Sequence, residues 1–176
     1  TPRLREAALE LGVPLRFVAA QRDLETLARV AVPAATVVAG HGVAIAVAEQ
    51  PLDVSSLGRP RGRLAVIGLG PGAAELMVPA VKAELARATD VLGYETYVRM
   101  AGPFRDDQVQ HCTDNREEMQ RARHAFRLAA EGRSVIVVSS GDPGVFAMAA
   151  AVLEALHESD DPAWHSVDLE ILPGVS

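Results

Sequence analysis

Cysteine is almost absent from this sequence, which has a single one, Cys112, in 176 residues. One cysteine excludes an intrachain disulfide and any metal cluster built on several cysteines. His111 is its neighbour, but two adjacent side chains without further ligands do not complete a zinc site. We therefore expect no metal, and the scarcity of cysteine fits a reducing compartment.

Long hydrophobic runs and an excess of positive charge are also missing. No stretch approaches the roughly 18 consecutive apolar residues of a membrane helix, and the first residues, TPRLREAALE, lack the apolar core of a signal peptide. The formal net charge of −6 disfavours nonspecific binding to nucleic acid. We expect a cytoplasmic protein that binds neither membranes nor nucleic acid.

The overall composition is that of a globular protein, with 49% hydrophobic and 23% charged residues. Residues 51–62 combine prolines, glycines and serines without periodicity, which is typical of a linker. The sequence therefore predicts a short α/β piece over residues 1–50 and a longer domain over residues 63–176. Within the short piece we expect a helix from Gln21 to Val30, a strand from Ala34 to Ala39, and the start of another helix over Val43 to Glu49.

The longer domain begins with an apolar run, Leu64 to Ile67, that ends in Gly68, Gly70 and Gly72. This pattern predicts a buried parallel strand whose carboxyl end turns sharply into a loop. Glycine permits a positive φ and has no Cβ, so such a loop can approach a ligand closely. Ligands of open α/β sheets bind outside the carboxyl ends of the strands.

Three further strands of the same kind are expected, at Thr89 to Leu92, Ser134 to Val138 and Val167 to Ile171. Helical patterns lie between them, which predicts an α/β fold with a parallel sheet and helices on both faces. Each strand is followed by a loop at the same edge of the sheet. Asp142, in the second of the three glycine-containing loops, is expected both to cap a helix over Val145 to Leu156 and to meet a hydroxyl or amine of a ligand.

A dinucleotide site is one interpretation of the first loop. Gly68, Gly70 and Ala73 satisfy the relaxed fingerprint, and Glu95 stands where an acid for the ribose would be sought. However, Pro71 removes an amide hydrogen from the turn, and Glu95 comes later than the usual spacing of about 20 residues. An NAD(P)-dependent oxidoreductase therefore remains the alternative.

The order VIGLGPG, GYETY, VVSSGDPGVFAMA and LPGVS resembles the tetrapyrrole methylase family, and with Glu117 and Glu118 it is most similar to the precorrin-3B C(17)-methyltransferases of cobalamin biosynthesis. The resemblance covers Arg63 to Ser176. It implies methyl transfer from S-adenosylmethionine to a precorrin, with ring contraction, without a metal, and in a homodimer. Family members bind cofactor and substrate between two α/β domains, so this chain would carry the first half of the active site.

The resemblance also implies roles for residues of the loops. The residues expected to bind S-adenosylmethionine are Gly70, Pro71, Ser140, Gly141, Asp142, Val145, Phe146, Pro173, Gly174 and Ser176. Tyr94, Glu95 and Tyr97 are candidates for the proton acceptor that ring contraction requires. Arg99 and Arg105 are candidates for binding precorrin carboxylates, or else are surface arginines that keep the domain soluble.

Two features depart from the family pattern. The family usually continues the first loop as Gly-Pro-Gly-Asp-Pro, whereas Ala73 and Ala74 follow Gly72 here. The sequence also closes at the LPGVS loop, before the second domain that the family has. A binding fragment without catalysis is therefore a further alternative.

Residues 1–50 resemble a different protein of the same pathway. LGVPLRFVAAQRDLETLA and GVAIAVAEQ are similar to the C-terminal domain of the cobalamin-biosynthesis protein CbiG, which also occurs alone as CobE.

Overall fold

The structure is a computed structural model that describes residues 6–8, 10–13, 15–18, 23–114, 116–145 and 148–175. The chain divides into two units, Thr1–Pro60 and Arg61–Ser176. The division falls within the predicted linker, near its end. Each unit is described separately below.

The N-terminal unit contains two antiparallel pairs of strands. β2 (Thr36–Gly40) pairs with β3 (Val43–Val47), and α2 (Leu24–Ala31) packs against this hairpin. β1 (Arg16–Phe17) pairs with β4 (Arg59–Pro60), so the end of the predicted linker belongs to this unit. The short helix η1 (Val54–Ser56) lies between β3 and β4.

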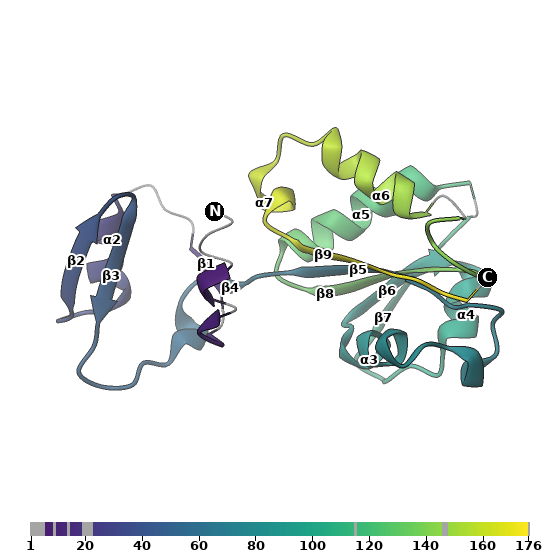
Figure 1. Ribbon diagram of the computed structural model, residues 1–176, viewed down its shortest axis with the longest axis horizontal. Helices are drawn as coiled ribbons and strands as arrows, with labels where there is room; N and C mark the ends of the chain where they lie inside the picture. The colour runs from purple at the N-terminus through teal and green to yellow at the C-terminus, as the bar shows by residue number, and fades with distance from the viewer. Residues whose placement is uncertain are drawn as a thin grey trace. The chain divides into compact units, whose positions relative to one another are not determined.

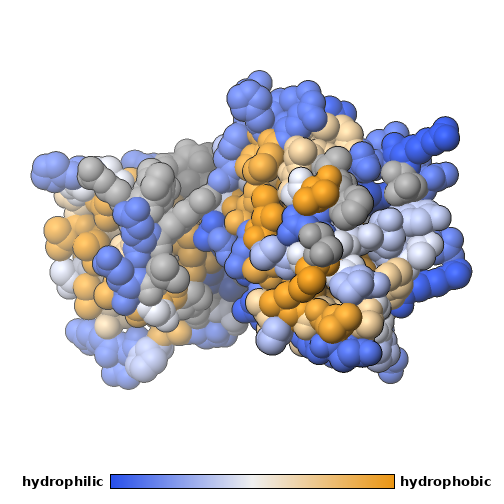
Figure 2. Space-filling view, turned by 45° about the vertical axis from the view of Figure 1, so that its right-hand side comes forward, coloured by the Kyte–Doolittle hydropathy of each residue, from blue (hydrophilic) through white to orange (hydrophobic). Residues whose placement is uncertain are grey.

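The prediction that a helix begins over residues 43–49 was wrong, because Val43–Val47 forms β3. His41 and Gly42 both have positive φ, at 51° and 75°, which is the conformation of the two-residue turn that joins antiparallel strands. Val32 is the only buried hydrophobic residue among the described part of this unit, and Val38, Ile45 and Val47 are exposed. Figure 2 shows apolar surface on both units.

The C-terminal unit is built on a five-stranded parallel sheet with the strand order β7-β6-β8-β5-β9. Its strands are β5 (Arg63–Gly68), β6 (Asp90–Tyr94), β7 (Val109–Thr113), β8 (Ser134–Ser139) and β9 (Asp168–Leu172). The helices are η2 (Ala74–Leu76), α3 (Pro79–Arg87), α4 (Glu95–Ala101), α5 (Glu118–Ala130), α6 (Met148–His157) and α7 (Pro162–His165). The predicted α/β fold, with a parallel sheet covered on both faces, is confirmed.

Alternate residues of β5 enter two separate hydrophobic cores, because successive side chains of a strand point to opposite faces. Leu64 and Val66 pack with residues of α5 and α6, whereas Ala65 and Ile67 pack with residues of α3 and α4. Figure 1 shows α5, α6 and α7 on one face of the sheet and α3 and α4 on the other. The sheet is thereby buried on both sides and fixes the loops at its edges.

Candidate active site

The strand order places the switch point of the sheet between the carboxyl ends of β5 and β8, which are neighbours in the sheet. After β5 the chain crosses to α3 on one face, and after β8 it crosses to α6 on the other face. The helices that follow two adjacent strands therefore lie on opposite faces of the sheet. This is the position at which open α/β sheets bind ligands.

The loops after β5 and β8 remain bonded to each other beyond the strands. The N–H of Leu69 donates to the carbonyl of Ser139 at 2.9 Å. Gly70 and Gly141 then exchange two backbone hydrogen bonds, of 3.2 and 3.0 Å. Both glycines have positive φ, at 64° and 54°, so a side chain at either position would be strained.

The loop after β9 packs against this pair. A Cβ on Gly68 or on Gly174 would lie within 3.0 Å of the carbonyl oxygen of Gly141. Asp142 links the loops as well: its Oδ1 accepts from the N–H of Gly144 at 2.7 Å, and its Oδ2 accepts from the N–H of Gly174 at 3.2 Å. The structure thus brings together three of the loops that the sequence singled out.

Asp142 makes the kind of bond by which an aspartate caps a helix, since its Oδ1 accepts from the N–H two residues later, that of Gly144. The described part of α6 runs from Met148 to His157, and residues 146 and 147 lie outside the described residues. The predicted cap and the predicted contact of Asp142 with a ligand both stay predictions.

The other residues predicted to bind a cofactor have more open surroundings. Pro71, Val145 and Pro173 are exposed at these loops, and Ser140 is half-buried. Within the described residues the hydroxyl of Ser140 donates no hydrogen bond, so it is available to a ligand. Phe146 and Ser176 lie outside the described residues.

Tyr94 and Tyr97 lie where β6 ends and α4 begins, at the same edge of the sheet as the three loops. Their rings meet edge to face, with centroids 5.4 Å apart and planes at 83°. Glu95 forms an ion pair with Arg99 one helical turn later, and both side chains are exposed. The two tyrosines and this pair form a second group beside the loops.

The structure does not bring Arg105 to this edge. Its guanidinium donates to Asp107 at 2.9 Å, to the carbonyl of Ala88 at 3.1 Å and to the carbonyl of Ala86. The hydrogen bond from Arg105 lowers the pKa of the Asp107 carboxyl. Since Ala88 precedes β6, this arginine binds near the amino end of that strand, where it holds the end of α3.

Gly68 belongs to the site, although it was not among the predicted site residues. The signal was present in the sequence, because Gly68 is the first of three glycines that follow a buried strand. No group of three or more His, Cys, Asp or Glu side chains within the described ranges could hold a metal ion. In the same part of the chain, no helix has the length and apolar character to cross a membrane.

The sequence of the C-terminal unit is similar to those of known proteins. The sequence model of the family described as Tetrapyrrole (Corrin/Porphyrin) Methylases matches residues 63–176. The chain is 48% identical over 116 residues to a precorrin-3B C(17)-methyltransferase of a Sinorhizobium species, an alignment that covers 65% of this chain and 44% of that protein. It is also 48% identical over 115 residues to the cobalamin biosynthesis protein CobIJ of Mycobacterium tuberculosis, covering 65% of this chain and 22% of that protein.

A solved structure leads to the same group of proteins. The crystal structure of the methyltransferase CobJ is similar with a TM-score of 0.61 and 52% identity, over 65% of this chain and 47% of that chain. The chain thus spans less than half the length of each of these relatives. The matched part corresponds to the C-terminal unit.

Proposed function

This chain belongs to the tetrapyrrole (corrin/porphyrin) methylase family, and we propose that residues 63–176 are the cofactor-binding half of a precorrin C(17)-methyltransferase. The observation that carries the proposal is the joining of the three loops through Gly70, Gly141 and Gly174 at the carboxyl ends of β5, β8 and β9. The similarity to a precorrin-3B C(17)-methyltransferase supplies the substrate class.

The three loops offer both polar and apolar groups to a cofactor. Among the described residues no partner is found for the hydroxyl of Ser140, and Val145 and Val175, on the second and third loops, are 70% and 56% exposed. Glycine at positions 68, 70 and 174 lets the three backbones meet without side chains between them. These residues fit S-adenosylmethionine, whose sulfonium supplies an already activated methyl group when it is bound.

The loops contribute to the reaction by positioning. Methyl transfer from a sulfonium is an in-line displacement, so orientation of the two reactants supplies much of the rate enhancement. Tyr94 and Tyr97, beside the loops, are our candidates for accepting a proton during ring contraction. Glu95 is the third candidate, with Arg99 as its ion-pair partner. Arg99, exposed at this edge, is our candidate for binding a precorrin carboxylate.

A dinucleotide-dependent oxidoreductase is less well supported. The N–H of Gly70 donates to Gly141 and is not free for a pyrophosphate. A dinucleotide fold places a helix N-terminus directly after the glycine loop, whereas α3 begins only at Pro79. The glycine turn therefore lacks both donors that the fingerprint normally provides.

Calorimetric titration with S-adenosylhomocysteine tests the proposal. We expect the chain to bind it, and we expect Asp142→Ala to weaken binding because the second and third loops separate. Asp106→Ala, an exposed carboxylate distant in the fold, is the matched control and should bind as the unaltered chain does. Competition by NADH would favour the oxidoreductase instead.

The whole reaction requires a second domain in this proposal. We expect the 176-residue chain alone to show little or no methyl transfer to a precorrin, because half of the cleft comes from the other domain. A longer chain that continues through a second domain should bind S-adenosylhomocysteine and turn over. Failure of that longer chain to bind it would contradict the proposed function.

A further inference from the structure

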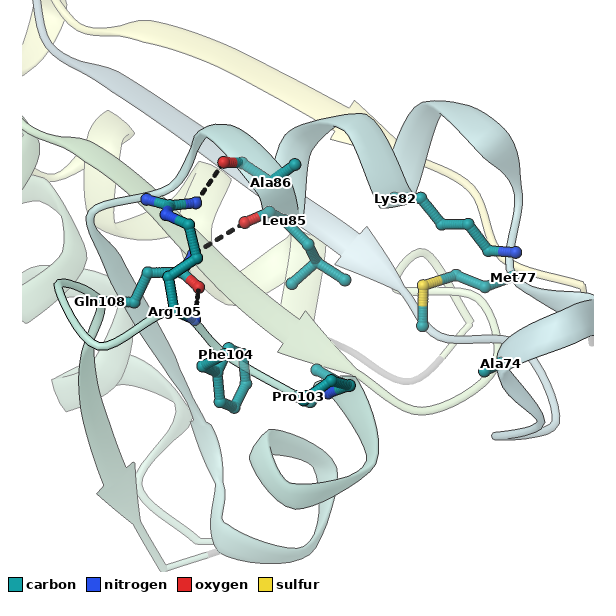
Figure 3. Close-up of a pocket in the computed structure, with 11 residues that line it drawn as sticks. Ala74, Met77, Lys82, Leu85, Ala86, Pro103, Phe104, Arg105 and Gln108 are labelled. Carbon is teal, nitrogen blue, oxygen red and sulfur yellow. Dashed lines mark hydrogen bonds between the residues drawn. The ribbon is translucent and has the colours of Figure 1, made fainter.

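A pocket of about 330 Å³ lies between α3 and the segment that follows α4. Most of its lining is apolar, and Met77 and Ala101 at its base are buried. Figure 3 shows Leu85 projecting from α3 toward the side on which Phe104 and Pro103 lie. None of the residues proposed above to bind the cofactor lines the pocket, although Ala74 follows the first loop directly. Its occupant is therefore a separate question from the methyl donor.

The polar groups at one end of the pocket already have partners. The amide of Gln108 donates to the carbonyls of Leu85 and Ala88 at 2.8 and 2.9 Å, and its oxygen accepts from the N–H of Arg105 at 2.8 Å. The guanidinium of Arg105 is paired with Asp107. This end therefore carries hydrogen bonds that hold the fold together and no uncompensated charge.

Lys82, at the other end of the pocket, has different surroundings. It is the only lysine of the sequence, and it is exposed on α3 above Met77. Among the residues that the structure describes, its ammonium has no hydrogen-bond or ion-pair partner. The pocket is thus an apolar hollow with one unmatched positive charge at its rim.

We propose that this pocket binds a small apolar carboxylic acid, with the carboxylate at Lys82 and the hydrocarbon part between Leu85 and Phe104. A single ammonium matches a monoanion, whereas a phosphate normally requires several converging donors. The volume lies at the lower end of the range for small-molecule sites, which favours a compact ligand. Apolar contacts with the pocket supply most of the affinity, and the ammonium of Lys82 favours a ligand with a negative charge.

The lone lysine permits a direct test. Reductive methylation with ¹³C-formaldehyde labels only Lys82 and the terminal amine and keeps the charge of both. Titration with 3-phenylpropanoate should shift the Lys82 resonance saturably and leave the terminal resonance in place. The uncharged 3-phenylpropanamide should bind about fivefold more weakly, which is the contribution of one accessible ion pair.

Two substitutions separate the parts of the proposal. Calorimetry with Lys82→Gln should show about fivefold weaker binding of 3-phenylpropanoate and an unchanged affinity for the amide. Ala74→Trp, at the exposed side of the lining, should abolish binding of both compounds because the indole fills the mouth of the pocket. Ala83→Trp, on α3 outside the lining, is the matched control and should bind normally.

Three results would overturn the proposal. One is the absence of a saturable shift up to about 10 mM acid, a concentration that detects even very weak binding. Another is a Lys82 shift that persists in Ala74→Trp, since the acid would then bind outside the pocket. The third is dissociation of an oligomer by Ala74→Trp in sedimentation experiments, which would make the pocket an interface with a second copy.

Discussion

Asp142 is bonded to Gly174 across two loops that are 32 residues apart in sequence: the carboxylate Oδ2 accepts the backbone N–H of Gly174 at 3.2 Å. The other oxygen of the same carboxylate holds Gly144 in its own loop. One side chain therefore sets the geometry within the second loop and its distance from the third. Asp142 is therefore a positioning residue for the second and third loops of the candidate site.

Gly174→Ala is expected to disrupt the junction of the loops. The added Cβ would lie within 3.0 Å of the backbone of both Gly141 and Gly68, and backbone cannot move aside as a flexible side chain can. We expect the free energy of unfolding to fall by more than about 2 kcal/mol, measured by urea denaturation.

The matched control for this substitution is Gly102→Ala. Gly102 has a φ of −68°, and its nearest neighbours leave ordinary contact distances of 3.5 Å or more for a Cβ. We expect its free energy of unfolding to change by less than about 1 kcal/mol. Equal effects of the two substitutions would show that the loops are not closely joined.

Asp90 should make the stability depend on pH in the acid range. Burial opposes its charged form, but hydrogen bonds with His111 at 2.8 Å and Thr89 at 2.8 Å, together with the charge of Arg133, lower the pKa of the Asp90 carboxyl below its usual value. A lowered pKa in the folded state adds stability above the unfolded pKa of about 3.9, and this is lost as pH falls through the folded value.

The measurement is urea denaturation of the unaltered chain and of Asp90→Asn at several pH values. The difference in free energy of unfolding should be constant near pH 6 and should shrink below about pH 4, as Asp90 becomes protonated in the unfolded state. Asp106→Asn is the control, because its side chain is exposed. A difference that stays constant down to about pH 2 would contradict this assignment.

The C-terminal unit could be predicted from the sequence because its local signals agree with its packing. The run Leu64 to Ile67 is apolar at every position, and the structure buries it on both faces between two helical layers. Glycine directly after such a strand allows close backbone contact, which is what Gly68 and Gly70 make with the neighbouring loops.

Other features were not predicted because the sequence pattern is compatible with more than one structure. Val43 to Val47 is compatible with a short helix or a strand, and the hairpin was decided by Gly40, His41 and Gly42 between two β-branched runs. Besides Asp107, Arg105 bonds to the backbone carbonyls of Ala86 and Ala88, which no side-chain pattern reveals. Contacts between residues so far apart in sequence can be identified only once the three-dimensional structure is known.

His124 should titrate below the usual range for histidine. Burial disfavours its charged form, and the nearby His111 and Arg127 add repulsion, so the pKa of the His124 imidazole is lowered despite Asp90 and Glu131. Its ring meets His111 edge to face, 5.0 Å between centroids.

A lowered pKa favours the neutral form of His124, whereas it favours the charged form of Asp90. In both cases the stability of the folded chain decreases as the pH falls. The folded state favours neutral His124, so its contribution is present above the unfolded pKa of about 6.5 and declines as pH falls below it. An NMR titration should give an imidazole pKa below 6.5, and His124→Gln should remove part of the loss of stability between about pH 7 and pH 5. A normal imidazole pKa would contradict the prediction.

Arg121 is buried, with 4% of its surface exposed, and ties the end of β7 to the start of α6. Its guanidinium donates to the hydroxyl of Thr113 at 2.8 and 2.6 Å, to the carbonyl of Asp114 at 2.7 Å and to the sulfur of Met148 at 3.4 Å. Burial lowers the pKa of Arg121, because removing the charged guanidinium from water is unfavourable.

Arg121→Ala should lower the free energy of unfolding by about 2–4 kcal/mol, because it leaves a cavity and removes the donors to Thr113 and Asp114. Arg121→Met should cost less, since the methionine keeps the packing of the stem and removes the need to bury a charge. The single tryptophan, Trp164, stacks on Phe126 in the same hydrophobic core at 5.0 Å, so its fluorescence can follow unfolding in urea.

The control for Arg121 is Arg123→Ala on the same helix. Arg123 is half exposed and forms an ion pair with Glu158 at 2.9 Å, and such surface pairs contribute about 0–1 kcal/mol. If Arg121→Ala destabilised the chain no more than Arg123→Ala does, the guanidinium would not be holding β7 to α6. If Arg121→Met proved as costly as Arg121→Ala, the hydrogen bonds rather than the packing of the stem would account for the loss.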